Sequence, residues 1–75
     1  MRYETEEYEL ARASYAIEDV ECYAQRYRDL AAKGVPATPY ARAILEAAAR
    51  LLEHSARADA FRGMADLSKG SQGGR

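Results

Sequence analysis

The sequence contains few of the residues that form chemical sites: one cysteine, one histidine and no tryptophan among 75 residues. The single cysteine, Cys22, excludes an internal disulfide and fits a reducing compartment, although it can still bond to another chain. The single histidine, His54, has no partner at the spacings of helical metal motifs, and metal sites need three or four convergent ligands. We therefore expect no metal and no cofactor. We expect His54 to be partly buried and hydrogen-bonded to a tyrosine or a carboxylate.

Long apolar runs and catalytic signatures are also missing. The longest apolar runs span three residues, such as 47–49, whereas a membrane span requires about 20. Acids, among them Glu6 and Glu7, stand where a signal peptide has its apolar region. Arg26 is the only basic residue three or four positions from Cys22. One arginine lowers the pKa of a thiol too little to make it a catalytic nucleophile. These observations predict a soluble, cytoplasmic protein that has no membrane partner and is not an enzyme.

What the sequence does contain is a helix stop followed at once by a helix start. Gly34 stands where a left-handed residue follows a helix, and Pro36 prevents continuation. Thr38 is a good N-cap, and Pro39 suits the first helical position. This segment predicts an all-α protein, an antiparallel αα-hairpin. The expected parts are a hairpin domain over 1–67, with helices over about 6–33 and 39–62 and a turn over 34–38, and a flexible polar tail over 68–75.

Apolar residues recur three and four positions apart in both helical segments, which is typical of packed helices. In the first segment the seam comprises Leu10, Ala13, Ile17, Val20, Ala24, Tyr27 and Ala31. In the second segment it comprises Ala41, Ile44, Ala48, Leu51, Ser55 and Ala58. We expect these two seams to face each other inside the hairpin.

The hairpin alone offers a thin core. Of the 36 hydrophobic residues, 16 are alanine and 13 are Val, Ile, Leu, Met or Phe. Domains below roughly 70–80 residues seldom obtain more than about 3–5 kcal/mol from a single core. Apolar residues that flank the seams point sideways out of the hairpin and predict a homo-oligomer, most simply a dimeric four-helix bundle. The expected interface comprises Ala16, Tyr23, Leu30, Leu45 and Leu52.

In layout, from Leu10 to Ala58, the chain resembles the Rop family of plasmid RNA-binding hairpins, whose seams also alternate alanine with larger residues. The resemblance implies a dimeric four-helix bundle and a regulatory role in binding nucleic acid. On the second helix Arg42, Arg50 and Arg57 lie seven or eight residues apart, a row that can follow phosphates. A nucleic-acid or nucleotide-binding hairpin is therefore the alternative function.

Tyrosine is the abundant aromatic residue, with six Tyr against one Phe. Tyr8, Tyr15 and Cys22 recur every seven residues, on the face of the first helix directed away from the second. Tyrosine combines a large contact area with tolerance of water, so this stripe predicts a binding surface that includes Glu18 and Asp19. The alternative is that the stripe lies inside a homo-oligomer.

Charge differs between the two halves of the chain. Residues 1–35 contain eight acids and five bases, and residues 36–75 contain four acids and six bases. The acidic half either meets a basic partner surface or complements the dipole of the first helix.

The leading hypothesis is a small non-enzymatic module, a homo-oligomeric hairpin that binds or inhibits a larger protein assembly. Short chains without motifs are frequent among inhibitors from phages and mobile elements, including anti-CRISPR proteins.

Overall fold

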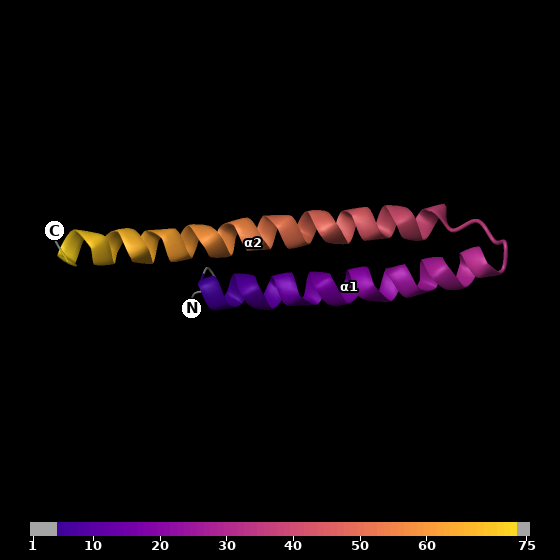
Figure 1. The fold of residues 1–75 in the computed structure, drawn as a ribbon, viewed down its shortest axis with the longest axis horizontal. Helices are drawn as coiled ribbons and strands as arrows, with labels where there is room; N and C mark the ends of the chain where they lie inside the picture. Colours follow the sequence, from indigo (N-terminus) through magenta and orange to yellow (C-terminus); the bar gives the residue numbers. More distant parts are fainter. Residues whose placement is uncertain (1–4, 74–75) are drawn as a thin grey trace.

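The fold is a pair of antiparallel helices, seen in a computed structural model that describes residues 5–73 and, of these, the side chains of 5–64. Helix α1 spans Glu6–Ala32 and helix α2 spans Thr38–Gly73. The two helices lie side by side, and α2 extends past the start of α1 (Figure 1). The predicted all-α helical hairpin is confirmed.

The ends of α1 carry the expected caps. Thr5 is the N-cap in extended conformation, and its Oγ1 accepts a hydrogen bond from the Tyr8 amide at 3.0 Å. At the other end Gly34 has φ +73° and donates its amide to the Ala31 carbonyl, while the Val35 amide donates to the Leu30 carbonyl, both at 3.0 Å. These two bonds define a Schellman ending and satisfy carbonyls that the helix leaves free.

Helix α2 begins one residue earlier than the sequence predicts. The Ala37 carbonyl accepts from the Tyr40 and Ala41 amides, at 3.0 and 3.2 Å, so Ala37 and not Thr38 is the half-helical residue that precedes the first turn. Pro39 still lies within that first turn, where an amide has no intrahelical acceptor and its absence costs nothing.

Helix α2 also ends much later than predicted. It continues to Gly73, so the expected end near residue 62 is wrong, and residues 68–73, which were expected in a flexible polar tail, belong to the helix. Residues 74 and 75 lie outside the described residues. The prediction relied on Gly63 as a helix end, but a glycine inside a helix costs only about 1 kcal/mol relative to alanine.

The contact between the helices is made largely of small side chains. Its fully buried members are one glutamate, Glu9, and five alanines: Ala13, Ala16, Ala37, Ala47 and Ala58. Among residues 5–64 no large side chain is fully buried. Alanines allow the two backbones to approach closely, at the expense of buried apolar area.

Helix α1 is therefore rotated relative to the expected seam. Leu10 and Ile17, which the periodicity places in the seam, are exposed, whereas Glu9 and Ala16, one residue before each of them, are buried. The rotation follows from packing, because alanines at Ala13 and Ala16 bring α1 nearer to α2 than leucine or isoleucine at the same place would. The largest side chains are consequently left outside the hairpin.

Candidate functional site

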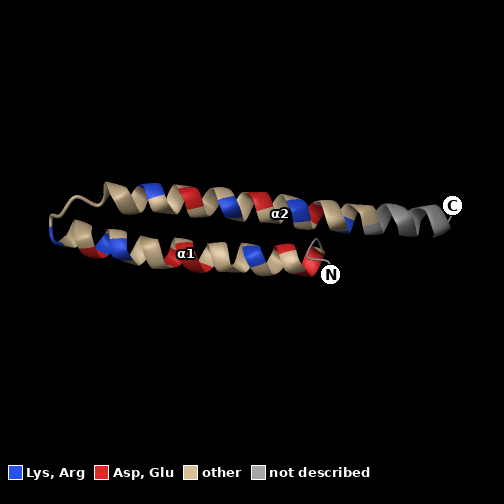
Figure 2. Cartoon of the chain, turned by 180° about the vertical axis from the view of Figure 1, so that it is seen from behind, with Lys and Arg blue, Asp and Glu red and all other residues tan. Residues whose placement is uncertain are grey.

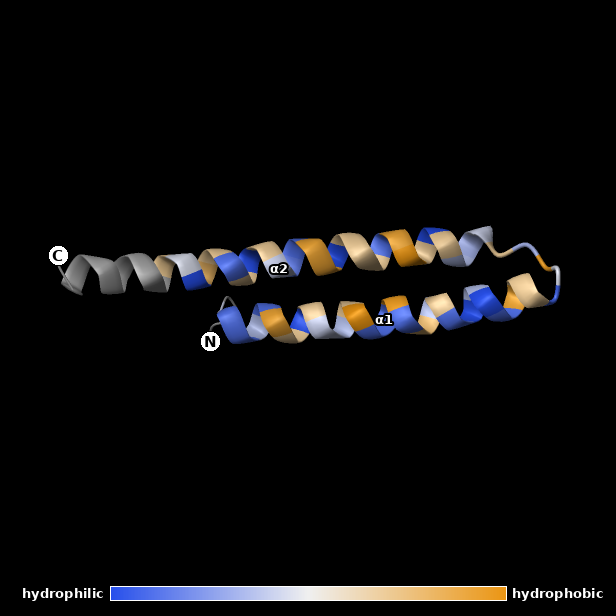
Figure 3. Ribbon diagram, in the orientation of Figure 1, coloured by the Kyte–Doolittle hydropathy of each residue, from blue (hydrophilic) through white to orange (hydrophobic). Residues whose placement is uncertain are grey.

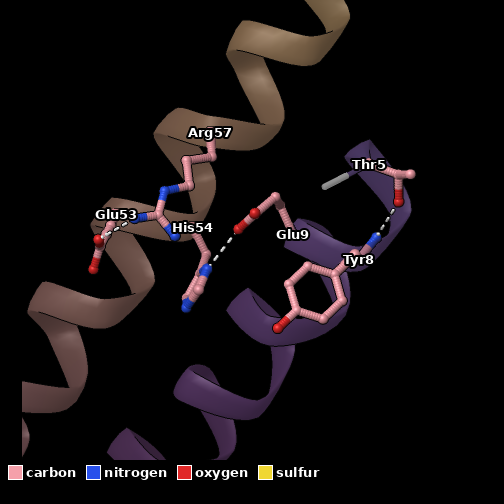
Figure 4. A network of polar contacts seen from close by, with 6 residues as sticks. All are labelled: Thr5, Tyr8, Glu9, Glu53, His54 and Arg57. Carbon is pink, nitrogen blue, oxygen red and sulfur yellow. Dashed lines mark hydrogen bonds and ion pairs between the residues drawn. The ribbon is translucent and has the colours of Figure 1, made fainter. Parts of the chain in front are cut away.

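Among residues 5–64, one buried polar contact joins the two helices, between Glu9 of α1 and His54 of α2 (Figure 4). Glu9 Oε1 lies 2.6 Å from His54 Nδ1, and the two side chains are 3% and 15% exposed. The predicted hydrogen bond of His54 to a carboxylate is confirmed. A glutamate so deeply buried requires such a partner, because an unpaired buried carboxylate is costly.

Chemically, catalysis and metal binding both need more groups than a single carboxylate–histidine pair supplies. A carboxylate that orients a histidine is one part of an acid–base site, but a nucleophile or metal must complete it. Ser55, the next residue, lies about 100° around the helix from His54. Among the described residues no group of three His, Cys, Asp or Glu side chains is placed to hold a metal ion.

Two ion pairs between the helices distinguish two sides of the hairpin. Arg50 Nη2 lies 3.2 Å from Asp19 Oδ2. Ile17 is two residues from Asp19, and Leu52 is two residues from Arg50. Two residues correspond to about 160° around a helix, so Ile17 and Leu52 both lie on the side of the hairpin opposite to this ion pair. Leu10 and Leu45 lie seven residues before them, about two turns away, and share that side.

This side, which we call the leucine side, consists of four exposed apolar side chains. They are Leu10, Ile17, Leu45 and Leu52, with exposed fractions of 47%, 43%, 70% and 71%. Strongly apolar residues recur along both helices (Figure 3). An ion pair between Glu6 and Arg62, with Oε2 2.9 Å from Nε, lies near its open end, because Glu6 is one turn before Leu10.

The structure divides the predicted oligomer interface. Leu45 and Leu52 are exposed on the leucine side, as the prediction requires. Ala16 is only 4% exposed and lies between the two helices, while Tyr23 and Leu30 are half-buried. The Tyr23 ring packs against Tyr40 of α2, with ring centroids 6.2 Å apart. The rotation of α1 turns Ala16, Tyr23 and Leu30 inward and brings Leu10 and Ile17 outward in their place.

The predicted partner-binding residues lie on a second surface, which we call the tyrosine side: Tyr8, Tyr15, Glu18, Asp19 and Cys22. Tyr8 and Tyr15 are 37% and 59% exposed. Each lies two residues before Leu10 or Ile17, which places the stripe about 160° around α1 from the leucine side. Glu18 and Cys22 are also exposed, and Asp19 is bonded to Arg50.

Two hollows lie on the tyrosine side, on either side of the Glu9–His54 contact. One, of about 140 Å³, is lined by Arg12, Tyr15, Ala16, Asp19, Arg50 and His54. The other, of about 420 Å³, lies where α2 passes the start of α1 and is lined by Glu9, Arg57, Ala60, Phe61 and Met64. Sequence reasoning missed this hollow, with half-buried Phe61 and exposed Met64 in its lining, because the hollow depends on how far α2 extends beyond α1.

The alternative nucleic-acid face is largely neutralised. Arg50 is paired with Asp19, and Arg57 Nη2 lies 2.5 Å from Glu53 Oε2, one turn away. Arg42 is exposed. Acids and bases alternate along α2 (Figure 2), so its positive potential is interrupted at every turn.

The chain was compared with protein-family models, with curated proteins and with solved structures. None of them matches. In the part of the chain that the structure describes, neither helix has a segment apolar and long enough to cross a membrane.

Proposed function

We propose that this protein is a small non-enzymatic interaction module, a homodimeric helical hairpin that binds and thereby inhibits a larger protein assembly. The observation that supports it is the placement of two different surfaces on opposite sides of one thin hairpin. The leucine side joins two copies, and the tyrosine side remains free to meet the partner.

Self-association is supported by the distribution of apolar side chains. The interface inside the hairpin buries mainly alanine, while four larger apolar side chains remain exposed together on the leucine side. A single thin core rarely stabilises a chain of this length, and a contiguous exposed apolar surface marks an interface. Burying the leucine side against a second copy supplies the missing core.

Partner binding is supported by the chemistry of the tyrosine side. Tyrosine, arginine and methionine are among the residues enriched in protein interfaces. This side presents Arg12, Tyr15 and Met64 around its two hollows, and Tyr8 beside Arg12. The Arg12 guanidinium lies over the Tyr8 ring, 6.0 Å from its centroid, which holds both side chains in place before binding. Such preorganised aromatic side chains are effective binding anchors.

The test is the double substitution Tyr8→Ala with Tyr15→Ala. We expect affinity for a partner identified by cross-linking in the source cells to fall at least thirtyfold, because an aromatic anchor typically contributes about 2 kcal/mol or more. Helicity and oligomeric mass stay unchanged. Tyr27→Ala, which removes an exposed tyrosine of α1 outside the stripe, is the matched control.

Two other outcomes contradict this assignment. If the double variant dissociates into monomers, the stripe belongs to the self-association interface. If the partner is a nucleic acid, binding weakens steeply as salt rises, whereas docking centred on tyrosine changes little.

A further inference from the structure

We infer that the larger hollow of the tyrosine side is a binding site for one tyrosine side chain of the partner, whose ring lies against apolar walls and whose hydroxyl donates a hydrogen bond to Glu9. The inference rests on the proposed function for the source of that tyrosine and adds which group the partner inserts. Three features of the hollow support it: a free oxygen at its floor, its apolar walls and the charges around it.

The floor of the hollow is the carboxylate of Glu9, whose side chain is only 3% exposed. Its Oε1 is bonded to His54 Nδ1, and the Glu9 side chain makes no other hydrogen bond among residues 5–64. In the same part of the chain no fully buried side-chain oxygen is left without a partner, so Glu9 Oε2 is accessible to solvent. Because Glu9 lines this hollow and not the smaller one, Oε2 opens into it as a free acceptor.

The walls and rim of the hollow are mostly apolar. Phe61 is half-buried, Ala60 is exposed, and Met64 is 57% exposed. An entering aromatic ring is favoured here, because it packs against the Phe61 ring and contacts the Met64 sulfur. The volume of about 420 Å³ is that of a ligand pocket, and such pockets combine apolar walls with a few placed polar groups.

The depth of the free acceptor decides which aromatic side chain fits. Glu9 is almost wholly buried, whereas Met64 at the rim is mostly exposed, so an entering side chain must carry its hydrogen-bond donor at its tip. The phenol of tyrosine has its donor there. Phenylalanine has no donor, and the indole of tryptophan carries its N–H at the side of the ring. Serine and threonine have a hydroxyl but no ring to fill the hollow.

The charges at the hollow favour an uncharged donor. Arg57 at the rim is about half exposed and is bonded to Glu53, and it repels an entering cation such as lysine. The Glu9 carboxylate repels an entering anion. A neutral hydroxyl loses less hydration than a charged group does when it is buried, and its hydrogen bond to a carboxylate is a strong one.

The hollow adjoins the surface proposed for the partner. Tyr8, one of the two expected anchors, precedes Glu9 by one residue at the start of α1. A partner that covers the tyrosine side therefore also covers the hollow, and one of its side chains is available to fill it.

The site is tested with two small uncharged probes, N-acetyl-tyrosinamide and N-acetyl-phenylalaninamide, which differ by one hydroxyl. We expect the tyrosine amide to shift the NMR signals of Ala60, Phe61 and Met64, with a dissociation constant on the order of 1–10 mM. The phenylalanine amide should bind about tenfold more weakly, because it forms no hydrogen bond to the carboxylate. Equal affinities, or no saturable shift of these signals, overturn the inference. Neither outcome affects the proposed function, which the variant of Tyr8 and Tyr15 tests separately.

Variants locate the site within the chain. Ala60→Phe fills the hollow, and we expect the affinity for the tyrosine amide to fall about tenfold or more. Ala56→Phe is the matched control, since it adds the same ring one turn earlier on α2, at an exposed position outside the lining. Glu9→Leu with His54→Leu removes the acceptor and leaves an apolar floor, so the two amides should bind equally. If Ala60→Phe acts no more strongly than its control, the site is wrong.

The source of the tyrosine is tested in the assembled protein. We expect Ala60→Phe to weaken binding of the cross-linked partner about tenfold, while the oligomeric mass stays unchanged. If Ala60→Phe dissociates the dimer, the inserted tyrosine belongs to a second copy. Tyr3 precedes α1 in this chain. If Tyr3→Ala raises the affinity for the tyrosine amide about tenfold or more, the hollow is filled by Tyr3 itself. Either outcome overturns the assignment to the partner.

Discussion

At the scale of single residues, the hairpin holds a buried polar contact, Glu9–His54, in an interface made largely of alanines. His54→Ala leaves the buried Glu9 carboxylate without a partner, so we expect the free energy of unfolding to fall by about 2–4 kcal/mol. Glu9→Leu with His54→Leu removes both polar groups and is expected to retain most of the stability. Urea unfolding followed by helicity, at one fixed protein concentration, measures both.

The control is Glu53→Ala, which breaks the exposed pair with Arg57 and should cost no more than about 0.5 kcal/mol. If His54→Ala costs as little, the Glu9–His54 contact contributes nothing. The sequence predicted the polar partner of His54 in kind but not in identity. Glutamates are usually exposed to solvent, and Glu9 lies 45 residues from His54 along the chain, so nothing in the sequence marks Glu9 as the partner.

At the scale of the helices, the two glycines Gly34 and Gly63 are expected to respond oppositely to replacement by alanine. Gly34 has φ +73°, and a Cβ added there meets nothing within 4 Å, so Gly34→Ala should cost about 1–2 kcal/mol of stability through the backbone alone. Gly63→Ala, inside α2 and equally unobstructed, should instead stabilise by about 0.5–1 kcal/mol. Thermal unfolding of both variants checks the opposite signs, and a shift of the same sign in both contradicts the assignment.

The helices show which features are local enough to be read from sequence. The stop at Gly34 was predictable because glycine, the following valine and Pro36 act within a few residues. The side of α1 that packs against α2 could not be predicted, because alanines lie beside the leucine stripe and periodicity alone assigns the larger residues to the seam. The packing instead favoured the closer approach that Ala13 and Ala16 allow.

At the scale of the whole molecule, the Cα positions span 62 × 27 × 13 Å, a layer one helix thick. Leu52→Glu places a charge in the centre of the leucine side, and we expect the dissociation constant of the dimer to rise about a hundredfold or more. Ala11→Glu places the same charge between Tyr8 and Tyr15 and should leave the dimer intact. Light scattering over a concentration series measures the dissociation constants of both variants. If only Ala11→Glu dissociates the dimer, the self-association surface is the tyrosine side and not the leucine side.

The fold class was predictable because one strong turn signal between two helical segments permits a single arrangement. The two surfaces were predictable in part: Tyr8, Tyr15, Leu45 and Leu52 are exposed as expected. The extension of α2 and the larger hollow beside it were not, because they depend on the relative lengths of the two helices.

The hairpin topology also orders the steps by which the chain folds. Three polar contacts between the helices, Asp19–Arg50, Glu9–His54 and Glu6–Arg62, join residues 31, 45 and 56 positions apart. The entropy lost in closing a loop grows with its length, so each contact is easier to form once the one nearer the turn is in place. We therefore expect the two helices to associate from Gly34 outward, and thermal fraying to begin at the opposite end, at the contact between Glu6 and Arg62.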